Sequence, residues 1–142
     1  MGESTDPSSL ARALNGALSL LARDAIGLAV AAGTLPGPEG VALSDRLRAM
    51  AASAMDDVRQ LSSRIATLGE TPEVEAAHLS LPAAWPASVE RLVADARETL
   101  AALVEAIPAD ADDTEGEATE HLLEHVIARK RDDMELLERA LR

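Results

Sequence analysis

The chain has no cysteine, phenylalanine or tyrosine, and Trp85 is its only tryptophan. The absence of cysteine excludes thiolate zinc sites, thiol catalysis and a disulfide framework. β-Sheet proteins rely on aromatic and β-branched side chains, so the scarcity of aromatic residues disfavours a sheet or a sandwich. Alanine and leucine dominate the sequence instead. The composition therefore predicts an all-α protein.

Basic residues are also scarce, since 13 lysines and arginines stand against 25 acidic residues and give a net charge of −12. Such a chain is not expected to bind nucleic acid or an anionic membrane surface. The N-terminus lacks the basic start and the apolar core of a secretory signal, and no apolar run approaches the ~20 residues of a membrane span. We therefore expect a cytoplasmic protein with no nucleic-acid and no membrane partner.

Four segments repeat apolar residues at spacings of three and four, which is typical of one face of a helix. These apolar seams cover residues 10–28, 43–68, 89–107 and 123–141. The length of 142 residues is that of one domain. We therefore predict a single four-helix bundle domain over residues 1–142, with a flexible N-terminus at 1–8.

The links between the seams predict the topology. The first link, at 33–40, and the third, near 108–113, have about eight and six residues, which is typical of antiparallel hairpins. The middle link, 70–87, contains three prolines that favour extended chain. It can reach nearly ~60 Å, whereas the second helix is about 42 Å long. We expect it to cross the full bundle, anchored by Trp85, and leave helices two and three parallel. A loose loop in an up-down-up-down bundle is the alternative.

Two segments resemble the ferritin-like superfamily. Residues Asp57–Pro72 contain the pattern R-I-x-x-L-G-x-x-P, and are similar to the end of the second helix in bacterioferritins and Dps-like proteins. Residues Glu120–Glu138 are similar to the last core helix of the family. The resemblance implies a ferritin-like bundle with a long crossover between helices two and three, and a homo-oligomer.

The resemblance also implies the positions of a di-iron centre, which takes one carboxylate from each of two helices and a Glu-x-x-His pair from each of the other two. These positions carry Asp24 on the first helix, Ala54 and Asp57 on the second, Ala96 on the third, and Lys130 and Asp133 on the fourth. Alanine offers no ligand atom and an ammonium group repels a cation. We therefore predict degenerate metal ligands at Asp24, Asp57 and Asp133, no resident cofactor and no ferroxidase activity.

Two charged residues continue the apolar seams of their helices. Asp24 lies on the first seam, and Lys130, which is the only lysine of the chain, lies on the fourth. An isolated ammonium group in a core is costly unless it finds a partner. We predict an interior ion pair between Asp24 and Lys130, with Asp57 close behind. The alternative is a Lys130 that extends to solvent and an Asp24 that faces a solvated groove.

The histidines leave two interpretations open. His121 and His125 are four residues apart on the fourth helix, a spacing that can hold one metal ion. A solvated pair on an acidic helix face is the alternative. DinB-like bundles hold a metal with three histidines, which would recruit His78, but they place their pair nearer the C-terminal half of the last helix.

Three functions remain in competition. The first is a ferritin-like protein without an intact di-iron site that acts as a structural or interaction subunit. The second is a metal-binding or iron-handling protein that uses a reduced site of Asp24, Asp57 and Asp133. The third is a small α-helical adaptor unrelated to ferritins. No catalytic motif favours an enzyme, and the sequence does not identify a protein partner.

Overall fold

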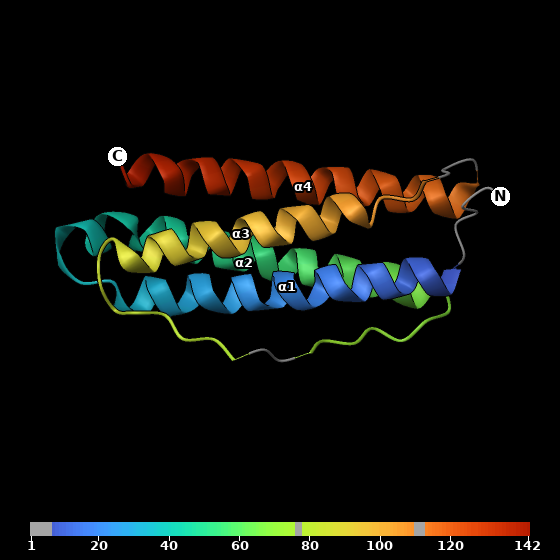
Figure 1. Ribbon diagram of the computed structural model, residues 1–142, viewed down its shortest axis with the longest axis horizontal. Coiled ribbons are helices and arrows are strands. Elements are labelled where there is room, and N and C mark those ends of the chain that lie inside the picture. The colour runs from blue at the N-terminus through green and yellow to red at the C-terminus, as the bar shows by residue number, and fades with distance from the viewer. Residues whose placement is uncertain (1–6, 76–77, 110–112) are drawn as a thin grey trace.

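The computed structural model describes residues 7–75, 78–109 and 113–142. Its four helices are α1 (Pro7–Thr34), α2 (Gly37–Thr67), α3 (Ala87–Glu105) and α4 (Thr114–Ala140), and they lie side by side in one bundle (Figure 1). Helix α1 packs against α2 and α3, and α4 packs against α3 and more sparsely against α2. Helices α1 and α4 are therefore diagonal neighbours. The predicted all-α four-helix bundle is confirmed.

The described parts of the segment between α2 and α3, residues 68–75 and 78–86, lie along α1 towards opposite ends of the bundle (Figure 1). Helices α2 and α3 consequently point in the same direction, as the expected crossover requires. The α1 side chains bind the backbone of this extended segment. Asn15 Nδ2 donates to the Thr71 carbonyl at 3.1 Å and its Oδ1 accepts from Glu73 N at 2.7 Å, while Ser19 Oγ accepts from Glu75 N at 2.8 Å. These bonds satisfy backbone groups that have no sheet partner.

The end of the crossover contacts the core. Trp85 is half-buried and, together with Leu81, packs against an apolar cluster that α1, α2, α3 and α4 share. The segment that the sequence placed at 70–87 occupies residues 68–86 between the two helices. The contacts of Leu81 and Trp85 with the core lie just before the first turn of α3, where the chain re-enters the bundle.

The first link is shorter than the eight residues that the sequence predicted. Only Leu35 and Pro36 separate α1 from α2. The proline- and glycine-rich run is instead the first turn of α2, because proline is tolerated there. Gly37 has a φ of +74°, and a Cβ on Gly40 would lie 2.1 Å from the Leu35 carbonyl oxygen. Both glycines are therefore needed for the tight turn.

The helix ends near the other links also differ in detail from the sequence expectations. Helix α1 already includes Pro7 and Ser8, so the expected flexible N-terminus of 1–8 is too long at its end, and its residues 1–6 lie outside the described residues. Helix α3 ends at Glu105, before Pro108. Asp113 caps α4 by accepting a hydrogen bond from Gly116 N, and this satisfies one free amide of the first turn.

Helix α1 is more apolar than we expected from the absence of a long uninterrupted apolar run. The Ser8–Thr34 part of α1 is long and apolar enough to cross a membrane by length and composition, with a mean hydropathy of 1.4 in its most apolar window. Half of that window is buried inside the bundle. The apolar character of α1 is explained by its central position, because it packs against two helices and the crossover.

The apolar core forms two clusters along the bundle. One gathers around Leu14, Leu21 and Leu123, and the other around Leu28, Leu47 and Val89. A layer of buried polar and charged residues comes from all four helices: Asp24, Asp57, Asp95, Thr99 and Lys130. Asp24 lies in sequence between the α1 residues of the two clusters, so the charged layer sits at mid-bundle.

Candidate functional site

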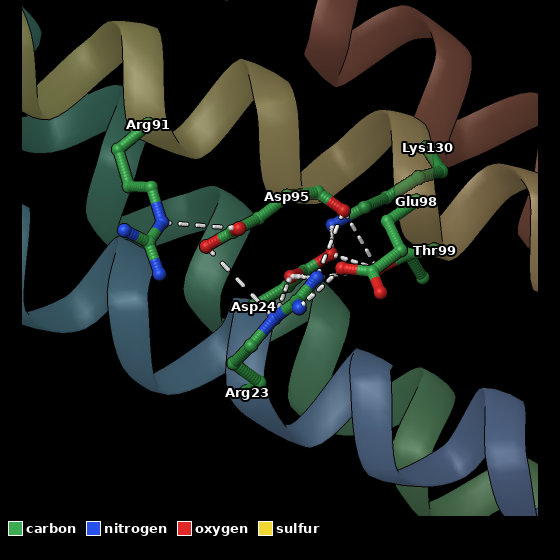
Figure 2. Close-up of polar contacts among 7 residues, drawn as sticks. All are labelled: Arg23, Asp24, Arg91, Asp95, Glu98, Thr99 and Lys130. Carbon is green, nitrogen blue, oxygen red and sulfur yellow. Dashed lines mark hydrogen bonds and ion pairs between the residues drawn. The ribbon is translucent and has the colours of Figure 1, made fainter. Parts of the chain in front are cut away.

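The charged layer is centred on one carboxylate and one ammonium group. Lys130 Nζ on α4 lies 2.6 Å from Asp24 Oδ2 on α1, and the two side chains are 7% and 3% exposed. Figure 2 shows them meeting in the space between the helices. The structure therefore brings together two residues that the seam spacing places inward on diagonal helices.

Two further residues complete the surroundings of Asp24. Thr99 Oγ1 on α3, which is fully buried, lies 2.6 Å from Asp24 Oδ2 and donates to it. The Arg23 guanidinium donates to Asp24 Oδ1 from Nη2 at 3.1 Å and from Nε at 3.2 Å. Both carboxylate oxygens are thus bonded to cations or hydroxyl groups, which is what a buried charge requires.

Arg23 links this centre to the molecular surface (Figure 2). Its Nη1 donates to Glu98 Oε1 at 2.7 Å and its Nη2 to the Asp95 carbonyl at 2.9 Å. Arg91 in turn donates to Asp95 Oδ1 at 3.2 Å. Burial lowers the pKa of Arg23, but the hydrogen bond with Glu98 and the charges of Asp24 and Asp95 outweigh it and leave that pKa raised. Arg23 therefore stays charged.

Asp57 makes a different ion pair from the one that the sequence suggested. It was expected close behind Asp24 as a partner of Lys130, but its Oδ1 contacts the Arg129 guanidinium. Arg129 is 38% exposed and reaches inward from the adjacent position on α4. Burial raises the pKa of the Asp57 carboxyl, although the hydrogen bond from Arg129 opposes this shift. The two buried aspartates therefore have separate partners on α4: Lys130 pairs with Asp24 and Arg129 pairs with Asp57.

Asp133 is the third carboxylate at the expected ligand positions. It is half-buried and lines a small cavity together with Asp24, Ala96 and Lys130. Burial raises the pKa of the Asp133 carboxyl, and the nearby Lys130 charge opposes the rise. All the candidate ligand positions on α1, α3 and α4 therefore face one space.

The residues at this site do not fit a di-iron centre. The cavity has a volume of about 10 Å³, which is near the threshold for one water molecule. Ala54 and Ala96 carry no ligand atom, and Lys130 Nζ lies 2.6 Å from Asp24 Oδ2, where its positive charge repels a metal ion. Among residues 7–75, 78–109 and 113–142, no three histidine or acidic side chains are grouped to hold a metal ion. The donor set instead favours an internal ion pair.

The histidines do not join this site. His121 and His125 are exposed on α4, with their Nε2 atoms 3.2 Å apart. His78 is exposed on the crossover, which runs along α1 (Figure 1). A three-histidine site is therefore not formed within the described part of the chain.

The same arrangement of helices occurs in solved bacterial structures. A ferritin-like diiron-carboxylate protein from Bacillus anthracis superposes with a TM-score of 0.88 at 22% identity, over 98% of this chain and 99% of that one. A dodecameric thioferritin, the bacterioferritin-related protein from Bacteroides fragilis, gives 0.84 at 17% identity, over 96% and 86%. A Dps protein from Vibrio cholerae O1 gives 0.83 at 19% identity, over 96% and 91%.

These similarities confirm the ferritin-like fold that the sequence resemblance implied. No protein-family model matches the chain, and no significant match was found among curated proteins. Because the identities are at most 22%, this likeness establishes the arrangement of the helices alone.

Sequence reasoning missed most of the residues that surround the two buried aspartates, Asp24 and Asp57. Arg23, Asp95 and Arg129 are charged residues beside seam positions, a pattern shared by every solvated helix face. Thr99 carried a signal, because it follows Ala96 by three positions and therefore lies on the same inward face of α3. Its hydroxyl group is the polar atom that a buried carboxylate on a neighbouring helix needs.

Proposed function

We propose that this chain is a ferritin-like protein that has exchanged the di-iron centre for an internal ion pair and acts as a structural or interaction subunit. The observation that carries the proposal is the position of Lys130, whose ammonium group lies 2.6 Å from Asp24 Oδ2 in the middle of the bundle. A cation that is part of the protein there takes the electrostatic role of a bound metal ion. It neutralises the buried carboxylate without any redox chemistry.

The proposal includes self-association in the cytoplasm. The similar thioferritin is described as dodecameric, and the outer faces of α1 and α2 carry exposed apolar side chains such as Ile26 and Met55. Exposed apolar residues on packed helices support an interface between subunits.

A reduced metal site of Asp24, Asp57 and Asp133 is the second candidate. It is favoured by the raised pKa values of Asp57 and Asp133, which burial causes, since such groups cluster at functional sites. It is disfavoured by the ion pairs, because Asp24 is bound to Lys130 and Asp57 to Arg129. The ferritin-like fold argues against the third candidate, an unrelated adaptor.

Ferrous oxidation separates the first two candidates. The parent protein is expected to oxidise Fe²⁺ at the rate of buffer alone, because the site lacks the ligands for two ions. A matched variant, Lys130→Glu, places a second carboxylate opposite Asp24. It should be less stable than the parent without metal and should regain stability when Mn²⁺ or Fe²⁺ is added. A saturable progress curve from the parent, with two irons per chain, would overturn the proposal.

Light scattering tests the assembly independently. We expect a mass that is a multiple of 14.9 kDa at micromolar concentration. Replacement of both Ile26 and Met55 by Lys should lower that mass while the helical circular dichroism is retained. A parent that scatters only as a monomer would contradict the subunit role.

A further inference from the structure

We infer that His121 and His125 together bind one divalent metal ion of intermediate softness, such as Zn²⁺, at the protein surface. This site lies outside the charged layer and does not depend on the function proposed above. It rests on the distance between the two imidazole nitrogens, their exposure and the charge around them.

The distance between the imidazole nitrogens matches the span of two ligands on one ion. The Nε2 atoms of His121 and His125 lie 3.2 Å apart. Two nitrogens that are each ~2.05 Å from zinc and 3.2 Å apart subtend an angle of about 100° at the metal. This lies between the ~90° of adjacent octahedral ligands and the ~109° of tetrahedral ligands. The two nitrogens are therefore already at the separation that chelation of one ion requires.

The orientation of the rings supports the same conclusion. The ring centroids are 4.5 Å apart and the ring planes are nearly perpendicular, at 88°. The rings are not stacked face to face, and the contact is made through the two Nε2 atoms. Without metal, one ring donates this hydrogen bond and the other accepts it. When a metal ion binds, the donating ring takes the other neutral tautomer, in which Nδ1 carries the proton that Nε2 gave up, so that each Nε2 offers a lone pair to the ion.

The surroundings favour a cation. Both rings are exposed, so that a hydrated ion reaches them without an opening of the bundle. Glu117, Glu120 and Glu124 lie on the same part of α4, and the chain carries a net charge of −12. This charge raises the local concentration of cations. No lysine or arginine occurs on α4 before Arg129.

The ligand type determines which ions are chosen. Imidazole nitrogen suits zinc, nickel and copper, whereas magnesium and calcium prefer oxygen. With two protein ligands, the remaining coordination positions are open to water or to a ligand from outside the chain. Structural zinc sites are closed by four protein ligands. The α4 site is therefore an exchangeable site and not a folding staple.

Isothermal titration of the intact protein with Zn²⁺ in a non-coordinating buffer tests the inference. We expect one Zn²⁺ per chain at the histidine pair. His121→Ala and His125→Ala should each weaken binding at least about tenfold, because each removes one of two ligands. His78→Ala is the matched control, since it removes an exposed histidine from the crossover and should bind like the parent.

Imidazole proton resonances provide a second readout. Zn²⁺ should shift the ring signals of His121 and His125 together and leave those of His78 in place. All four proteins should have the same helical circular dichroism, because the three substitutions are at exposed positions. Equal binding by parent and all three variants would assign the metal to surface carboxylates and overturn the inference. Equal weakening by His78→Ala, or no binding by the parent at millimolar Zn²⁺, would overturn it as well.

Discussion

Two ion pairs of similar chemistry occupy opposite environments in this molecule. Lys130 and Asp24 meet at 2.6 Å in the bundle interior, where the side chains are 7% and 3% exposed. Arg59 and Asp56 meet at 3.0 Å on the surface of α2, where they are 70% and 52% exposed. The distances differ by a few tenths of an ångström, so the difference between the pairs lies in their access to water.

The comparison shows why the interior pair needs further protein groups around it, whereas the surface pair does not. Removing two charges from water costs several kcal/mol per ion, and their attraction repays this only when other hydrogen bonds satisfy the same groups. Asp24 accordingly contacts Thr99 and Arg23 as well as Lys130. Water solvates most of the charged atoms of the Arg59–Asp56 pair, so this pair contributes little to the stability of the fold.

The largest expected effect is that of Lys130→Ala. It leaves Asp24 buried with Arg23 as its remaining cation, and we expect a loss of about 3 kcal/mol in the free energy of unfolding. The shift of the denaturant midpoint measures this loss. Arg131→Ala, at the next and exposed position of α4, is the control and should change the midpoint little. A Lys130→Ala midpoint equal to that of the parent would show that the interior pair contributes nothing.

Thr99→Val should have the next largest effect. The substitution keeps the branched shape of the side chain but removes the hydroxyl that lies 2.6 Å from Asp24 Oδ2. Loss of a hydrogen bond to a buried charged group costs about 1.5–3 kcal/mol. Thr67→Val is the matched control, because its hydroxyl is exposed and bonds only to the Ser63 carbonyl in its own helix. If the two variants unfold at the same denaturant concentration, Thr99 has no role in the charged layer.

Asp133→Asn should give a smaller effect that depends on pH. Burial raises the pKa of Asp133 in the folded protein, so the folded state binds its proton more tightly than the unfolded state does. The stability linked to that proton is fully present below the unfolded pKa and is lost as pH rises through the folded pKa. Asparagine stays neutral, so the variant should exceed the parent in stability at pH 7, with a difference that shrinks towards pH 3. Denaturant unfolding of both proteins between pH 3 and pH 7 measures this difference. A variant that is less stable than the parent at pH 7 would contradict the expected effect of burial on Asp133.

Arg59→Ala should have the smallest effect. Its partner Asp56 is exposed, and the hydrogen bonds from Gln60 and Arg59 lower the pKa of that carboxyl. Gln60 remains after the substitution, and exposed ion pairs on a helix contribute little to stability because water screens them. The denaturant midpoint of Arg59→Ala should therefore stay close to that of the parent, and its shift should be far smaller than the shift caused by Lys130→Ala. A loss as large as that of Lys130→Ala would remove the distinction between the two environments.

The fold was largely predictable because its determinants are local. Apolar spacing marked the four helices, and three prolines marked an extended crossover. The first link was misjudged because Pro38 is compatible with either a loop or a first helical turn, and Gly37 and Gly40 allow the tighter geometry. Local composition does not distinguish these two outcomes.

The site was predictable only where a charge interrupted an apolar seam. Asp24 and Lys130 meet that condition. Arg129 does not, since it is adjacent to a seam position and reaches Asp57 by its length. Arg23 likewise turns inward from the edge of α1 to contact Asp24 and Asp95. Packing between helices decides which charged side chains at the edge of an apolar seam turn inward. The spacing of residues within one helix does not contain this information.

The double substitution Asp24→Leu with Lys130→Met tests the central claim most directly. Apolar residues of similar volume often replace a buried ion pair without loss, whereas removal of one partner is costly. We predict that each single substitution lowers the denaturant midpoint strongly and that the double variant recovers most of the loss, which is a favourable coupling between the two positions. Additive losses, with the double variant less stable than either single one, would contradict an internal ion pair in place of the metal centre.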